Sequence, residues 1–151
     1  MAKKLKLEVD HDPEFRIIGL SSTLKSYKLA FRINQSLQTN LKRIRDFTSH
    51  TASIDQTIKH TVFLHAVKDS SGFICLLQNR SQEGFLIPLY RQADYFFMFY
   101  EFPREEQIPE YTQKLKKTNG ILTAFPIDNP PAKNVGRIFQ DLEIHIMEKP
   151  E

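Results

Sequence analysis

Residues suited to metal binding are sparse in this chain, and their spacing matches no common metal site. Asp10, His11 and Asp12 carry metal-ligand groups, but three consecutive residues cannot converge well on one ion, so we interpret them as a solvated loop. His60 and His65 are five residues apart, and a strand directs such residues to opposite faces. We therefore predict no metal site.

Groups suited to nucleophilic or acid–base catalysis are equally few. Cys75 lies in the apolar run ICLL and is interpreted as a small core residue, not a nucleophile. Glu105 and Glu106 form a carboxylate pair, which the start of a helix explains better. The sequence has no phosphate-binding glycine loop, nucleophile elbow, HExxH or CxxC motif. We predict no catalytic residue and no cofactor.

Composition indicates a globular protein that folds as one domain. With 151 residues, 40% of them hydrophobic, the chain is long and apolar enough to bury a core. Its single cysteine cannot form an internal disulfide, which fits a reducing compartment. The start, MAKKLKLEVDHD, lacks the apolar run of a signal peptide, and no window reaches the roughly 20 apolar residues of a membrane span. We predict a cytoplasmic single domain over residues 1–151, with a frayed tail over about 147–151.

Basic residues are concentrated in the first third of the chain. The formal net charge is +3, but the segment from Arg16 to Asp46 has seven basic residues and one acid, so it carries +6 and the remainder −3. Such a segment suits phosphate groups or an acidic protein face, and the alternative is a solvated surface that keeps the protein soluble. The candidate partner-binding residues are Lys25, Lys28, Arg32, Lys42, Arg43 and Arg45.

Hydrophobic periodicity indicates two β-α-β units of similar length. The first unit has its strand, helix and second strand at Phe15–Leu20, Thr23–Leu37 and residues 41–47. The second has them at Tyr95–Phe102, about Ile108–Lys117 and Ile121–Ile127. Each helix is followed by a Thr-Asn pair. A turn with a glycine predicts a hairpin between the units, made of Thr61–Val67 and Phe73–Gln78.

The remaining segments complete an α+β domain. Residues 3–9 alternate as a half-exposed strand, residues 48–59 are interpreted as a polar loop or irregular edge, and Leu142, Ile144 and Ile146 alternate as a late edge strand. Two β-α-β units with an inserted hairpin imply a ferredoxin-like sandwich, with an antiparallel or mixed sheet and a C-terminal extension. Both helices then pack on one face of the sheet and leave the other face free.

The first predicted helix has a wide apolar arc and a narrow polar stripe. At 100° per residue the arc contains Leu24, Tyr27, Leu29, Ala30, Phe31, Ile33 and Leu37. The stripe opposite contains Lys25, Lys28, Arg32, Gln35 and Ser36. We expect the helix to be well buried and to present only a basic edge to water.

The stretch Tyr95–Phe102, YFFMFYEF, is almost entirely aromatic. Both faces of such a strand are apolar, which predicts a central strand covered on each side. A base-stacking platform would need basic residues among the aromatic ones, and this stretch has none. The second cover is the hairpin with the C-terminal tail, a second subunit or a ligand. The residues of one face, interpreted as core or subunit interface, are Phe96, Met98, Tyr100 and Phe102.

Ile87-Pro88 followed by Asp94-Tyr95 resembles the signature of an uncharacterised family of small bacterial proteins named for an I-P-E…D-Y motif. The segments FRIIGL, LKSYKLAFRINQSL, LKR and ILTAFPID are also similar, so the likeness extends over most of the chain to about Asp128. Leu89 stands where the signature glutamate is expected. The family has no assigned activity, so the resemblance implies no catalytic or cofactor residues. From its position, Asp94 is expected to cap or hydrogen-bond the chain entering the aromatic strand.

Three hypotheses for function follow. The first is a non-enzymatic binding or regulatory domain whose partner is another protein or a second copy in a homodimer. The second is RNA binding through the basic helix edge, because RNA-recognition modules use a ferredoxin-like sheet; such binding should weaken steeply with salt. The third is an enzyme with an unrecognised site. No membrane partner is expected.

Overall fold

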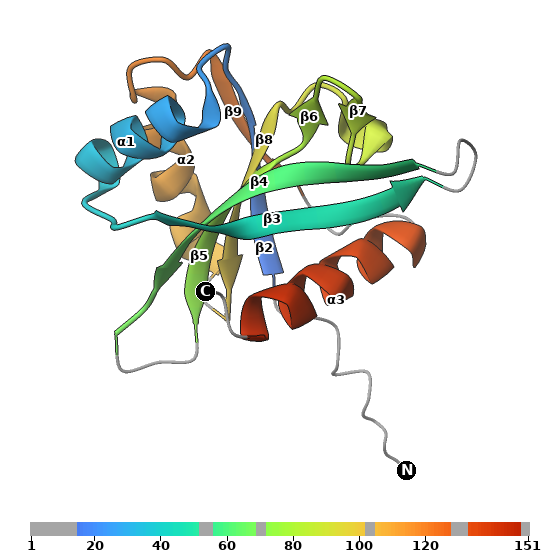
Figure 1. Cartoon of the computed structure of the whole chain (residues 1–151). Coiled ribbons are helices and arrows are strands. Elements are labelled where there is room, and N and C mark those ends of the chain that lie inside the picture. Colours follow the sequence, from blue (N-terminus) through green and yellow to red (C-terminus); the bar gives the residue numbers. More distant parts are fainter. Residues whose placement is uncertain (1–14, 52–55, 69–71, 102–104, 128–132, 149–151) are drawn as a thin grey trace.

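The computed structural model describes residues 15–51, 56–68, 72–101, 105–127 and 133–148. Over these residues the protein is an α+β domain with a six-stranded sheet and three α-helices (Figure 1). The sheet strands are β2 (Phe15–Ser21), β3 (Lys42–Thr51), β4 (Gln56–Ala66), β5 (Phe73–Gln78), β8 (Tyr95–Tyr100) and β9 (Thr123–Ile127). The helices are α1 (Ser26–Leu37), α2 (Ile108–Lys116) and α3 (Lys133–Met147). None of the described helices has the length and apolar character needed to cross a membrane.

The connection from β5 to β8 is the most irregular part of the described chain. It contains a small two-stranded sheet of β6 (Arg80–Ser81) and β7 (Gly84–Phe85), followed by the 3-10 turn η2 (Pro88–Tyr90). A second 3-10 turn, η3 (Glu105–Gln107), leads into α2. Pro88 therefore begins a turn, where its missing N–H costs nothing.

The sheet has the order β3-β4-β5-β8-β2-β9, and each of these neighbouring pairs is antiparallel. The aromatic strand β8 is central, as predicted, with β5 on one side and β2 on the other. In this register Tyr100 lies opposite Phe73 of β5 and Phe15 of β2, and its ring centroid is 4.8 Å and 5.1 Å from theirs. Such ring contacts stabilise the sheet beyond simple burial.

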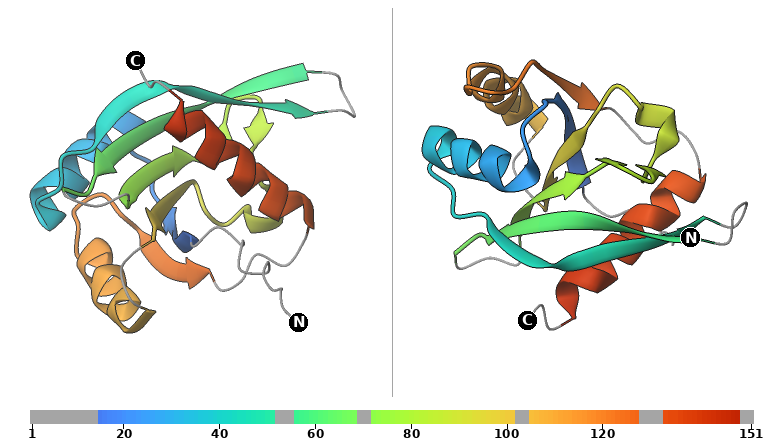
Figure 2. Two further views of the ribbon diagram at one scale, coloured as in Figure 1. Left: turned by 90° about the horizontal axis from the view of Figure 1, so that it is seen from below. Right: turned by 45° about the horizontal axis from the view of Figure 1, so that its top comes forward.

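Both faces of the sheet are covered, and the layers differ in composition. Helices α1 and α2 lie on one face and α3 on the other (Figures 1 and 2). Alternate residues of β8 enter the two cores: Tyr95, Phe97 and Phe99 face α1 and α2, whereas Phe96, Met98 and Tyr100 face α3. All six are buried. The strand is therefore enclosed by the chain itself.

The prediction of a late edge strand was wrong, because this segment is helix α3. Phe139, Leu142 and Ile146 are buried at the three- and four-residue spacing of a helix, whereas Ile144 is 58% exposed. Apolar residues at 142, 144 and 146 are compatible with a strand or with a helix. The spacing of Phe139, Leu142 and Ile146 distinguishes the two and indicates a helix. Because α3 covers the second face of the sheet, neither a second subunit nor a ligand is needed there.

Residues 48–59 were predicted as a polar loop or irregular edge; those described lie in strands β3 and β4, so the loop was wrong, whereas β3 is an edge strand. Strands β3 and β4 pair in antiparallel register as far as Thr51 and Gln56, with an irregularity between Ile44 and Phe47. On β4 the alternate residues Ile58, His60 and Val62 are buried, as in a strand with one face on the core. Residues 52–55 lie outside the described part, as do residues 3–9, for which a strand was predicted.

Candidate functional site

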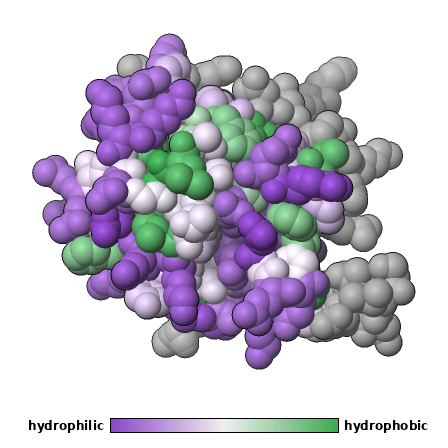
Figure 3. Space-filling model, turned by 90° about the horizontal axis from the view of Figure 1, so that it is seen from above, coloured by the Kyte–Doolittle hydropathy of each residue, from purple (hydrophilic) through white to green (hydrophobic). Residues whose placement is uncertain are grey.

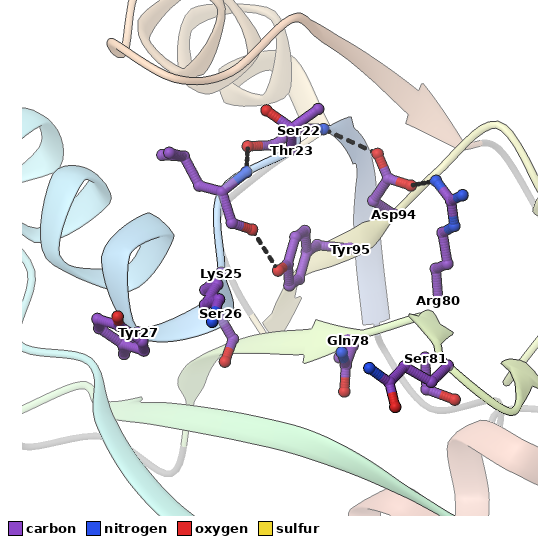
Figure 4. Close-up of a pocket in the computed structure, with 12 residues that line it drawn as sticks. Ser22, Thr23, Lys25, Ser26, Tyr27, Gln78, Arg80, Ser81, Asp94 and Tyr95 are labelled. Atoms are coloured by element: carbon purple, nitrogen blue, oxygen red, sulfur yellow. Dashed lines mark hydrogen bonds and ion pairs between the residues drawn. The ribbon is translucent and has the colours of Figure 1, made fainter.

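A hollow of about 720 Å³ opens at the end of the sheet near the start of α1 (Figure 4). We call it the end hollow. One wall is formed by residues 22–27, which connect β2 to α1 and form its first turn. The opposite wall comes from Gln78 and residues 80–82, and the floor from Asp94 and Tyr95. Three segments far apart in the sequence thus meet here.

Asp94 fixes the two walls of the end hollow relative to each other. Its Oδ2 accepts a hydrogen bond of 2.9 Å from the backbone N–H of Ser22, and its Oδ1 accepts one of 3.3 Å from Nη1 of Arg80. Its backbone N–H donates to the carbonyl of Leu20. Asp94 was expected to cap or hydrogen-bond the chain entering β8, but its side chain bonds Ser22, just after β2, and Arg80 of β6.

Hydrogen bonds of the Ser22 and Tyr95 hydroxyls fix the connection between β2 and α1. The buried Ser22 hydroxyl donates to the carbonyl of Gly120 at 2.6 Å and accepts from the N–H of Leu24 at 3.1 Å. The Tyr95 hydroxyl donates to the carbonyl of Leu24 at 2.7 Å. Burial, and then the negative charge of Asp94, raises the pKa of Tyr95 to about 12. The phenol therefore stays protonated at neutral pH, as its donor role requires.

Asn79, which no sequence pattern singled out, organises the chain beside the end hollow. It is fully buried, and its Nδ2 donates to the carbonyls of Tyr90 and Ala93 at 3.1 and 2.9 Å. Its Oδ1 accepts from the N–H of Ile87 at 2.8 Å. Of the signature residues, Ile87 is buried, Pro88 is exposed in η2, and Asp94 and Tyr95 form the floor of the hollow. Asn79 thus bonds the loop that carries the signature.

The outward side of α1 differs from the prediction. Tyr27 and Phe31 were expected in the apolar arc, but they are 62% and 58% exposed. The helix buries Leu29, Ala30 and Ile33 against the sheet. A helix lying on a sheet with nothing outside it buries only a narrow stripe, and residues 27 and 31 fall beyond that stripe. Seen from above, apolar groups lie among hydrophilic ones on this end of the molecule (Figure 3).

We call Tyr27, Lys28, Phe31 and Arg32 the α1 outer face. Tyr27 and Phe31 are one turn apart, as are Lys28 and Arg32, so an aromatic and a basic column run side by side along the helix. Lys28 is exposed and Arg32 is partly buried. Tyr27 also lines the end hollow, which makes the two surfaces continuous.

The six basic residues predicted from the sequence form two groups. Lys25 lines the end hollow, and Lys28 and Arg32 follow it on α1. Lys42, Arg43 and Arg45 lie on the edge strand β3, where Arg43 pairs with Asp46 at 2.9 Å and Arg45 with Glu148, the residue after α3, at 2.8 Å. Charged edge strands discourage pairing with other chains, which gives the β3 group a structural explanation.

The aromatic residues predicted as core or interface lie within the chain. Phe96 and Met98 have no exposed surface, and Tyr100 is buried with its hydroxyl donating to Glu143 of α3 at 2.6 Å. Phe102 lies outside the described residues. Among the described residues, then, this face of β8 packs against the chain's own C-terminal helix.

Two of the other candidates for chemistry, Cys75 and His65, lie in the described part of the chain. Burial raises the pKa of the Cys75 thiol, so it is protonated and enclosed. Nδ1 of His65 accepts a hydrogen bond of 3.0 Å from the N–H of Asn40. Within the described ranges, no group of three or more histidine, cysteine, aspartate or glutamate side chains is placed to hold a metal ion. Asp10, His11 and Asp12 fall outside those ranges.

Comparison with known proteins identifies no relative that would assign a function to the end hollow or to the α1 outer face. No protein-family model matches the chain, and neither a curated protein nor a solved structure matches it. The similarity to the I-P-E…D-Y family therefore remains a prediction.

Proposed function

We propose that this protein is a cytoplasmic, non-catalytic domain that binds single-stranded RNA through the α1 outer face. The observation that carries the proposal is the exposure of Tyr27 and Phe31 beside Lys28 and Arg32. Proteins that bind single strands combine aromatic rings, on which bases stack, with basic groups that follow the phosphates. The β8 stretch lacks that combination, whereas α1 has it.

The spacing on α1 suits two neighbouring bases. Side chains four residues apart on a helix have Cβ atoms about 5–6 Å apart, within the reach of one nucleotide step in an extended strand. A ring with more than half its surface exposed has a face available for stacking, which contributes about 1–3 kcal/mol per base. Lys28 and Arg32 lie beside the rings, where they can contact the linking phosphates.

A protein partner would use the same surface, but its composition favours RNA. Cores of protein interfaces are enriched in aromatic residues and arginine but depleted in lysine, and here Lys28 stands between the two aromatic residues in sequence, with Lys25 one turn before it. The sequence predicted that one face of the sheet would be free, and a homodimer could have formed through it. Because α3 covers that face, the structure gives this homodimer no support. We therefore propose RNA as the ligand, and binding of an acidic protein instead of RNA would refute this proposal.

We also propose that the sheet is an expanded ferredoxin-like arrangement. The order β9-β2-β8, with α1 after β2 and α2 after β8, supports this assignment. Strands β4 and β5 then lie between β8 and β3, the strand that follows α1. RNA-recognition modules of this type bind through the open sheet face. Here α3 lies on that face, so RNA would bind instead to the layer formed by α1 and α2.

The test is fluorescence anisotropy with a labelled single-stranded RNA of mixed sequence, hydroxylated at both ends. We expect Tyr27→Ala and Phe31→Ala each to weaken binding by about tenfold or more, because each removes one stacking ring. The matched control is Ile144→Ala, since Ile144 on α3 has the same 58% exposure as Phe31. This variant should bind like the wild type.

Salt provides a second readout of the same complex. Two phosphate contacts predict a slope of about −1.4 in a plot of log K against log salt concentration, and Lys28→Gln should halve it. Lys116→Gln, on the exposed side of α2, should leave it unchanged. If the α1 variants bind RNA as tightly as the wild type, or if only acidic peptides bind and RNA does not, the proposal is wrong.

A further inference from the structure

We propose that the end hollow binds the terminal phosphate monoester of the RNA strand whose bases stack on the α1 outer face. This inference rests on the proposed function and adds a polarity to it: one end of the strand would be held at the start of α1. It is carried by the hydrogen-bonding groups that line the hollow and by the position of Tyr27 at its rim.

Unused groups in the end hollow are mainly donors. Within the part of the chain that the structure describes, the hydroxyls of Thr23 and Ser26 and the ammonium group of Lys25 make no hydrogen bond or ion pair with other residues, yet all three line the hollow. The side-chain oxygen Oε1 of Gln78 accepts from the N–H of Thr61 at 3.1 Å, which leaves the side-chain N–H₂ of Gln78 as a further donor. The Lys25 ammonium and the Gln78 N–H₂ can only donate, and the two hydroxyls can donate as well as accept, so a ligand rich in acceptors suits these groups.

The negative charge in the hollow is already engaged. Both carboxylate oxygens of Asp94 accept hydrogen bonds, from Ser22 and from Arg80, and the Tyr95 hydroxyl donates to a backbone carbonyl. Asp94 has only 17% of its side chain exposed, whereas Arg80 has 66%. Arg80 carries five N–H donors and uses one of them on Asp94, so it can bind an anion while keeping this contact.

The cationic side chains stand on opposite walls. Lys25 comes from the α1 wall and Arg80 from the β6 wall, with Tyr95 between them and Asp94 beside the Arg80 guanidinium (Figure 4). Lys25, Arg80 and Asp94 give the hollow a net charge of +1, so an anion between the cations is favoured. A phosphate monoester, with up to two negative charges and three terminal oxygens, suits the donors of either wall.

The size and position of the hollow agree with the end of a strand. A volume of about 720 Å³ lies within the range of small-ligand sites and exceeds what a phosphate group alone needs. Tyr27 belongs both to the lining of the hollow and to the aromatic column of α1. A terminal nucleotide can therefore place its phosphate in the hollow and its base beside Tyr27, while the next base reaches Phe31.

The experiment compares three RNAs of one sequence: with a 5′-phosphate, with a 3′-phosphate, and with hydroxyls at both ends. We expect one phosphorylated form to bind the wild-type protein about tenfold more tightly than the unphosphorylated form, and this form identifies the end that is held. Lys25→Gln and Thr23→Val should reduce the preference to about twofold or less. Lys28→Gln should weaken all three RNAs by the same factor and keep the preference.

The outcomes separate the two proposals. If all three RNAs bind equally and the α1 variants still weaken them, the end hollow is not a phosphate site and the proposed function stands. If no RNA binds, the proposed function fails, and a nucleoside monophosphate tests the hollow alone by calorimetry. Saturable binding of this probe, lost in Lys25→Gln, would support the hollow, and its absence would overturn it. Arg80→Gln is a weaker test, because it also removes the contact with Asp94.

Discussion

The buried His60 predicts that this protein loses stability in mild acid. Its imidazole has no exposed surface, and burial lowers its pKa from 6.5 to about 4, although a hydrogen bond with the backbone of Gln78 and the charge of Asp46 act in the opposite direction. The folded state therefore keeps His60 neutral at pH values where the unfolded chain would protonate it. Between pH 6.5 and about 4 the unfolded state binds the additional proton.

The sign and the size of the effect follow from this difference. Stability from His60 is fully present above pH 6.5 and is lost progressively as the pH falls toward 4. The full shift corresponds to about 3 kcal/mol, and lowering the pH from 7 to 5 should already cost about 2 kcal/mol of unfolding free energy. That loss is a substantial part of the stability of a small domain.

Urea unfolding at pH 7 and pH 5 measures this loss directly. The His60→Gln variant, which cannot titrate, should start less stable at pH 7 but should lose about 2 kcal/mol less than the wild type on going to pH 5. His65→Gln, on the same strand but partly exposed, is the matched control and should retain the wild-type loss. Equal losses in the wild type and in His60→Gln would refute the reasoning.

Two further substitutions test how the end hollow is supported. Gly120 has φ +102°, and a Cβ there would collide with the side chain of Leu24, so Gly120→Ala should lower the unfolding free energy by about 1–3 kcal/mol. Asn119→Ala, at an exposed position, is the control. An unchanged denaturation midpoint in Gly120→Ala would contradict this prediction. Asn79→Ala leaves two buried backbone groups, the N–H of Ile87 and the carbonyl of Ala93, without this partner, while the carbonyl of Tyr90 keeps the N–H of Ala93; it should cost about 3 kcal/mol, seen as a Tm lower by about 6–12 °C. A shift below about 2 °C would show that water replaces the side chain.

Local periodicity was enough to predict the elements whose pattern is long and one-sided. The structure has α1, α2 and the strands β2, β5, β8 and β9 close to their predicted ranges. The β3–β4 pair was missed at its distal end because residues 48–59 are polar. Long strands that leave one face in water need only alternate buried residues, here Ile58 and His60. The α3 helix was missed because three alternating residues were given more weight than the longer spacing that includes Phe139.

The candidate site was less predictable, because it depends on contacts between distant segments. The basic residues of α1 could be found from charge alone, but whether Tyr27 and Phe31 are exposed depends on what lies outside α1. A narrower arc of Leu29, Ala30 and Ile33 would have been sufficient to anchor the helix. No local signal points to Arg80 or Asn79, since their roles arise from the loop that brings residues 78–82 beside Asp94.

The position of α3 in the chain has a consequence for biosynthesis. Every strand of the sheet precedes α3, so during translation the aromatic side of β8 is complete before its cover has been made. Until α3 has left the ribosome, the nascent sheet would present Phe96 and Met98 to the cell's folding factors. A ribosome stalled before α3 should therefore hold a chain that recruits chaperones, and release of α3 should end that association.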